Sequence, residues 1–150
     1  MKGLPGKMMA AAERYRAACH EVADDKSPLE AGGWNLHQLT SHTRDVEIYV
    51  YGARMRRTVE EENPEFQDFD AEAWMAENYD PNEPFADLLD NFMSSVQKAV
   101  DWLDALPSES WDRESRHEMA KGSVFTLRDW VERDIAHIEE HLETVEKANN

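Results

Sequence analysis

The fold is decided by residues 83–106, which read EPFADLLDNFMSSVQKAVDWLDAL. Apolar side chains recur in this stretch every three or four positions, the spacing that places them on one face of an α-helix. Asn82 is expected to cap the helix, and Pro107 is expected to end it. The apolar face consists of Phe85, Leu88, Leu89, Phe92, Val96, Ala99, Leu103 and Leu106.

Three further segments have the same helical pattern. The first spans about Pro5 to Asp25, and the second runs from Asn35 to about Glu62, ahead of Pro64. The inward row of the second helix is predicted to be Leu39, His42, Val46, Tyr49, Val50 and Ala53. The last helix is expected to follow Thr126 and to carry the row Leu127, Val131, Ile135, Ile138, Leu142 and Val145.

Two of these helices begin with a capping box, in which a polar side chain and a partner three residues later bond each other's backbone. The pairs are Asn35 with Gln38 and Thr126 with Asp129. Residues 63–82 form a long connection with a short helical piece near Ala71 to Tyr79, and no segment predicts a convincing strand. The sequence therefore predicts an all-α fold. We expect a single domain over residues 1–150, an up-and-down-like four-helix bundle with a long connection between helices two and three.

The charge of the chain disfavours nucleic acid as a partner. The 32 acidic residues exceed the 16 basic ones, which gives a formal net charge of −16. The one basic cluster, Arg54, Arg56 and Arg57, runs directly into three glutamates at 60–62.

No stretch reaches the roughly 20 apolar residues that span a bilayer, and the first residues do not form a convincing signal peptide. We therefore expect a cytoplasmic protein without a membrane partner.

The histidines carry the strongest chemical signal. His137 and His141 are four residues apart in the last helix, so they share one face and can reach the same ion. His42 lies in the inward row of the second helix and can complete a three-histidine metal site with an open position. His37 is five residues before His42 and is expected to point away, while His117 lies in a loop.

Simpler interpretations of these histidines remain open. Solvated or hydrogen-bonded histidines have the same spacing, and a buried imidazole needs only some partner to satisfy it. Residues 137–141 also match the H-x-x-E-H pattern of inverted zinc proteases. That match is set aside, because the helix is rich in glutamate and those enzymes are much larger.

The sequence resembles the DinB-like superfamily over roughly Gly32 to Val145. Members typically have Gly-Trp before the second helix and a histidine eight residues after that Trp, which correspond here to Gly33-Trp34 and His42. Asp45 and Glu47 follow, as in many members. The last helix of members has a Gly, a Thr-Leu, a Trp and His-x-x-x-His, and these positions correspond to Gly122, Thr126-Leu127, Trp130, His137 and His141.

The resemblance implies a four-helix bundle, commonly dimeric, with one divalent metal on His42, His137 and His141. Zinc, nickel or another first-row metal suits imidazole ligands. Asp45 and Asp134 lie about one turn from a ligand and can orient an imidazole through its other nitrogen. The alternative for these carboxylates is an ion pair with Arg44, Arg128 or Arg133.

Two classes of function follow from this resemblance. The first is a metal-dependent enzyme with a small-molecule substrate, similar to S-transferases that use a low-molecular-weight thiol such as bacillithiol or mycothiol. Metal-dependent hydrolysis is the alternative reaction, and no catalytic residue is assigned. The second class is a non-catalytic metal-binding or interaction module, whose ion would be closed by a fourth ligand such as His117 or a carboxylate near Asp68 and Asp70.

Overall fold

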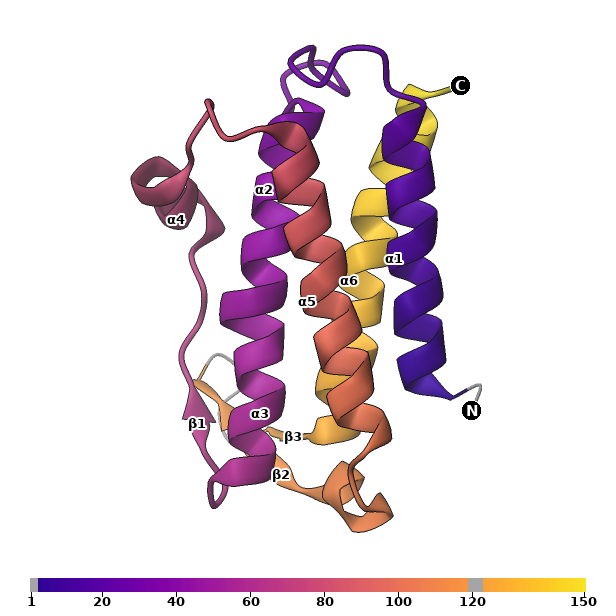
Figure 1. The fold of residues 1–150 in the computed structure, drawn as a ribbon. Helices are drawn as coiled ribbons and strands as arrows, with labels where there is room; N and C mark the ends of the chain where they lie inside the picture. The colour runs from indigo at the N-terminus through magenta and orange to yellow at the C-terminus, as the bar shows by residue number, and fades with distance from the viewer. Residues whose placement is uncertain (1–2, 119–122) are drawn as a thin grey trace.

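The computed structural model describes residues 3–118 and 123–150 and is a four-helix bundle, as the sequence predicts. The first bundle helix is α1, Leu4–His20, and the second is continuous but composite. It consists of α2 (Leu36–Val46), the π-helical turn η1 (Glu47–Tyr51) and α3 (Gly52–Glu60). The bundle is completed by α5, Phe85–Asp104, and α6, Leu127–Ala148, which lie side by side with the others in Figure 1.

The predicted capping boxes are both present. Asn35 and Gln38 exchange side chain-to-backbone hydrogen bonds at the start of α2, with distances of 2.8 and 2.9 Å. Thr126 and Asp129 do the same at the start of α6. These reciprocal bonds satisfy backbone N–H groups that the first helical turn leaves without partners.

Two predicted helix boundaries were wrong. The third bundle helix begins at Phe85, with Pro84 and not Asn82 at its N-cap, because a proline disfavours helical backbone in the residue before it. The first helix ends at His20 and not near Asp25. Its C-cap, Glu21, bonds the carbonyls of Ala18 and Cys19 and closes the last turn.

The third bundle helix runs in the opposite direction to the one that an up-and-down bundle requires. Figure 1 shows that the connection 61–84, which includes α4 (Ala71–Asn78), returns along the side of the bundle, so that α5 runs parallel to α2 and α3. His37 of α2 fastens the end of this connection. Its Nδ1 bonds the Tyr79 hydroxyl and its Nε2 bonds the Glu83 carbonyl oxygen, each at 2.6 Å.

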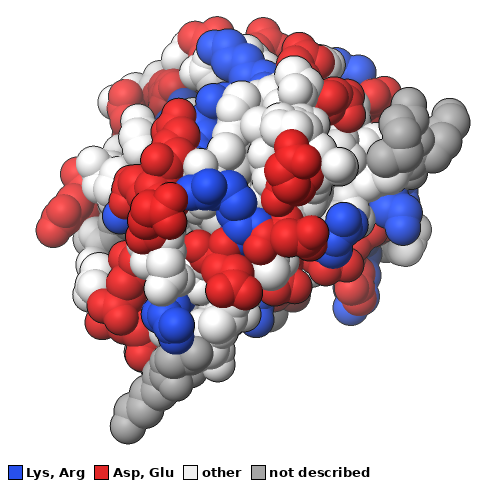
Figure 2. All heavy atoms as spheres, turned by 90° about the horizontal axis from the view of Figure 1, so that it is seen from below, with Lys and Arg blue, Asp and Glu red and all other residues white. Residues whose placement is uncertain are grey.

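Three short strands, which the sequence did not predict, cover the lower end of the bundle. β1 (Glu65–Phe66) pairs parallel with β2 (Glu114–His117), and β2, which follows the 3₁₀ turn η2 (Ser108–Asp112), pairs antiparallel with β3 (Val124–Thr126). Strands this short have almost no sequence period, and the β1 pairing joins distant segments. On this end, acidic and basic side chains are interspersed (Figure 2).

The π-helical turn changes which side chains face the core. A Cβ on Gly52 would lie 2.6 Å from the carbonyl oxygen of Glu47, so only glycine fits where the helix widens. The extra residue in this turn rotates the register. Tyr49, predicted to point inward, is therefore 57% exposed and packs its ring against Trp74 at 5.1 Å.

The core lies between the four helices. The α5 stripe supplies Leu88, Leu89, Phe92, Val96, Ala99 and Leu103, all of which are buried as predicted. No helix among the described residues has the length and apolar character needed to cross a membrane.

Candidate metal centre

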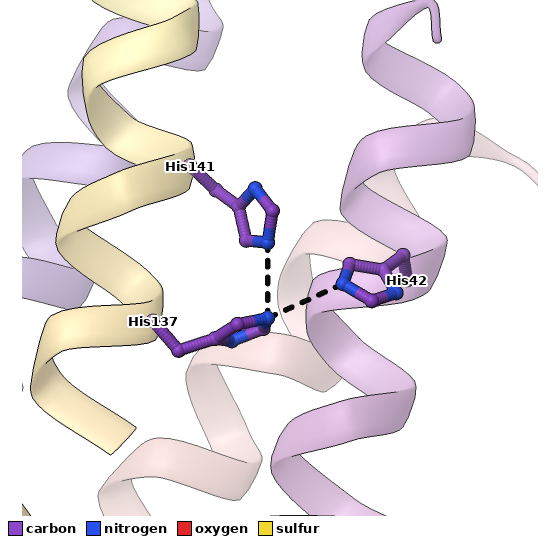
Figure 3. A group of neighbouring side chains, drawn as sticks. All are labelled: His42, His137 and His141. Carbon is purple, nitrogen blue, oxygen red and sulfur yellow. Dashed lines mark hydrogen bonds between the residues drawn. The ribbon is translucent and has the colours of Figure 1, made fainter. Parts of the chain in front are cut away.

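Three imidazoles converge between α2 and α6. His42 projects from α2, and His137 and His141 project from successive turns of α6 toward it (Figure 3). The Nε2 atom of His137 lies 3.2 Å from Nε2 of His42 and 2.9 Å from Nε2 of His141. One ligand atom from each residue lies within 4.8 Å of the others, so the structure brings together the three residues that the sequence singled out.

This arrangement fits a metal ion better than a hydrogen-bonded cluster. Two nitrogens that are each 2.0–2.1 Å from one tetrahedral ion lie about 3.3 Å apart, close to the separations found here. Nε2 of His137 faces two other Nε2 atoms, yet a neutral imidazole has only one N–H to donate. A cation between the three nitrogens would use all three lone pairs together.

Burial keeps the three imidazoles neutral. It lowers the pKa of His42 to about 4, with a further contribution from His141 and a partial offset by Asp45. It lowers the pKa of His137 to about 3, helped by its two histidine neighbours, and the pKa of His141 to about 4. Neutral imidazoles have a free lone pair, which is the form that ligates a metal.

Aromatic rings hold two of the imidazoles in place. Trp34, just before α2, packs against His42 with ring centroids 5.1 Å apart, and Tyr51 of η1 packs against His137 at 5.5 Å. A hollow of about 320 Å³ opens beside the cluster, with His141 in its wall together with Trp34, Leu39, Glu140 and Thr144. The centre therefore adjoins a space in which a small molecule can bind.

The two carboxylates predicted to orient the imidazoles have other surroundings. Asp45 accepts hydrogen bonds from Arg44 Nε at 2.7 Å and Trp74 Nε1 at 2.9 Å, so it forms the ion pair considered as the alternative. Its influence on His42 is electrostatic. Asp134 is fully buried, and its oxygens accept no hydrogen bond from any other described group.

Asp134 interacts with Glu47, which the sequence offered only as a family position. Both carboxyl groups are buried, and no other described group donates a hydrogen bond to them. Each carboxyl group shifts the pKa of the other. Burial raises the pKa of Glu47 to about 7, and burial and the Glu47 charge raise that of Asp134 well above its ordinary value. Two such groups are satisfied when they share a proton. The sequence signal for the position of Glu47 is Gly52, five residues later, which permits the π-helical turn.

The remaining histidines and acids do not join the cluster. His37 points away from it as predicted, and His20 is exposed on α1. His117 lies in β2 against Trp130 and Phe125. Within residues 3–118 and 123–150, no fourth His, Cys, Asp or Glu, including Asp68 and Asp70, completes the set. Gly122, the glycine of the compared motif, lies outside the described residues.

Comparisons with known proteins agree with this architecture. The structure of YfiT from Bacillus subtilis, described as a probable metal-dependent hydrolase with an unusual four-helix bundle topology, superimposes with a TM-score of 0.84. The two sequences are 20% identical, and the match covers 97% of this chain and 83% of that one. No curated protein sequence matches. Residues 9–145 match the family described as the DinB superfamily, and the chain therefore belongs to that superfamily.

Proposed function

We propose that this protein is a metal-dependent enzyme that binds one first-row divalent ion on His42, His137 and His141 and acts on a small molecule. The observation that carries the proposal is the convergence of three neutral imidazoles beside a hollow of about 320 Å³. A bound ion would supply Lewis acidity, which makes a coordinated thiol or water more acidic. Three neutral ligands leave the full charge of such an ion available.

We favour transfer of a low-molecular-weight thiol, as the family resemblance implies. The chain's own residues hold the substrate and exclude water. Trp34 and Leu39 give the hollow an apolar wall, and His141 brings that wall to the centre. The substrate's reacting atom would lie against His141, where bulk solvent is partly excluded.

Hydrolysis is the second candidate, and the description of YfiT as a probable metal-dependent hydrolase favours it. The two reactions differ only in the nucleophile, so the same three histidines serve either. A closed structural site is less well supported, because no fourth protein ligand lies among the described residues.

The exposed side chains of Ile48 and Tyr49 support the proposal of a homodimer.

Metal binding is tested by reconstituting the purified protein with zinc or nickel and measuring bound metal after gel filtration. We expect about one ion per chain, and His42→Ala, His137→Ala and His141→Ala should each weaken binding by at least about tenfold. The matched control is His20→Ala, an exposed histidine of α1. Equal binding by wild type and the His137→Ala variant would remove the proposal.

The reaction is tested separately with the metal-loaded protein. A chloro-nitroaromatic electrophile with a panel of small thiols probes S-transfer, and a panel of activated esters probes hydrolysis. Turnover that requires both metal and thiol supports the first candidate, and turnover of esters alone supports the second. Full metal occupancy without turnover in either panel would favour the binding module.

A further inference from the structure

Two arginines lie directly below the histidine cluster. Arg133 is four residues before His137 on α6, so it lies on the same face, about one helical turn lower. Arg54 approaches from α3, on the second bundle helix, which supplies His42 higher up. The two guanidinium groups therefore belong to the same helix pair that builds the candidate metal centre.

Aromatic rings hold both guanidinium groups. The Cζ atom of Arg54 lies 4.9 Å from the centre of the Trp130 ring, and that of Arg133 lies 4.6 Å from the centre of the Phe125 ring. The Phe125 and Trp130 rings are 4.8 Å apart and inclined by 31°. Arg54 also donates from Nη2 to the Gln67 carbonyl at 2.8 Å. Stacked arginines of this kind are preorganised, since less rotamer entropy is lost on binding.

Neither arginine is neutralised by a carboxylate within 4.0 Å in the described parts of the chain, although acidic residues outnumber basic ones two to one. Asp68 acts on Arg54 only electrostatically. Burial, followed by smaller effects that include Arg133, lowers the pKa of Arg54. Arg54 is half-buried and Arg133 is exposed beside it, so the two cations, which disfavour each other, leave a positive potential for an anion to offset.

Tyr51 links this pair of cations to the metal centre. Its ring lies 5.5 Å from that of His137 and 6.4 Å from that of Trp130, between the two groups. Burial and then Asp134 raise the pKa of the Tyr51 hydroxyl, Arg54 and Arg133 partly offset this, and Glu140 adds a smaller increase. No described residue hydrogen bonds to this hydroxyl, which leaves it able to donate to a bound group. A hollow of about 400 Å³ is lined by Arg133 and Phe125, with Asp129 and Glu132 also in its wall.

We propose that Tyr51, Arg54 and Arg133 form an anion-binding subsite about one helical turn below the histidine cluster, which binds the carboxylate or phosphate group of a small substrate. The guanidinium groups supply charge-assisted hydrogen bonds to the oxyanion, and the Tyr51 hydroxyl adds a neutral one. The role as a substrate subsite rests on the proposed function, whereas the anion binding itself does not need the metal. The reacting group of the substrate would lie at the histidines, with its anionic group toward β3.

The test uses metal-free, ¹⁵N-labelled full-length protein titrated with inorganic phosphate or with acetate at constant ionic strength. The indole N–H of Trp130 is the reporter, because its ring lies under Arg54 and it donates to Ser115 Oγ at 2.7 Å. We expect a saturable shift of this signal. Arg54→Gln and Arg133→Gln should each weaken binding by about tenfold, and Tyr51→Phe should weaken it less. The matched control is Arg16→Gln, an exposed arginine of α1, which should bind as wild type.

Several results would overturn the proposal. They are an absent or non-saturable shift, equal weakening by Arg16→Gln, and binding seen only after metal loading, which would place the anion on the ion. Arg133→Lys guards against a folding defect, because Arg133 is exposed and lysine keeps the charge but loses the planar fork. This variant should fold normally and still bind phosphate more weakly. We expect anion binding to persist in the His137→Ala variant. This result would show that the anion subsite does not depend on metal binding, so a failure of the metal site would not count against it.

Discussion

Replacing Glu47 by glutamine should stabilise the metal-free protein at alkaline pH. In the folded chain the pKa of Glu47 is about 7, against 4.5 for the ordinary carboxyl, because burial of the side chain raises it more than the hydrogen bond with Asp134 lowers it. The folded chain therefore retains a proton between these pH values that the unfolded chain has released. The contribution of this retained proton to the free energy of unfolding is fully present below about pH 4.5, and it is lost as the pH rises through 7.

The size of the effect follows from the raised pKa. Each pKa unit corresponds to roughly 1.4 kcal/mol, so the ionisation of Glu47 costs the folded state about 3 kcal/mol above pH 7. Glutamine does not ionise, and its amide can hydrogen bond to the Asp134 carboxyl, whose raised pKa favours the protonated form. Glu47→Gln should therefore match wild type near pH 4.5 and be about 3 kcal/mol more stable at pH 8.

Urea denaturation at both pH values measures this difference. The histidine contributions to the pH dependence are common to both proteins and cancel in the comparison. Asp134→Asn should change stability in the same direction, whereas Glu60→Gln, at an exposed position of α3, should follow wild type at both pH values. A stability difference that does not change with pH, or a Glu47→Gln variant that is less stable at pH 8, would refute the argument.

Further outcomes are expected from other parts of the structure. Phe92→Ala, at a fully buried position of α5, should lower the free energy of unfolding by about 3–5 kcal/mol in urea titrations. Gly52→Ala should destabilise by about 1–3 kcal/mol because its Cβ would meet the Glu47 carbonyl, although helix propensity alone predicts stabilisation. Metal binding should persist below pH 6 and fail only as the pH approaches about 4, where the histidine ligands take up protons, and equilibrium dialysis measures this. Light scattering should give twice the chain mass of 17.3 kDa, and a monomer would contradict the homodimer.

Features set by neighbours within one helical turn were predictable from the sequence. The apolar stripe of α5 and the two capping boxes depend on contacts three or four residues apart, and both were found. The geometry that pairs His137 with His141 is equally local. Their meeting with His42 followed from the inward row of the second helix and the family resemblance, and the structure places the three Nε2 atoms together.

What the sequence left open depends on contacts between distant segments. The parallel course of α5 is set by a connection that His37 fastens more than 40 residues away, at Tyr79 and Glu83. The short sheet pairs residues 65–66 with 116–117. The π-helical turn before Gly52 changes the backbone register, so that Tyr49 points outward and Glu47 lies against Asp134. The sequence by itself determined the helices, their caps and the histidine pair, since these rest on local spacing. Only the tertiary structure decided the buried carboxyl pair and the arginines beside Tyr51, because each needs two helices at a fixed register.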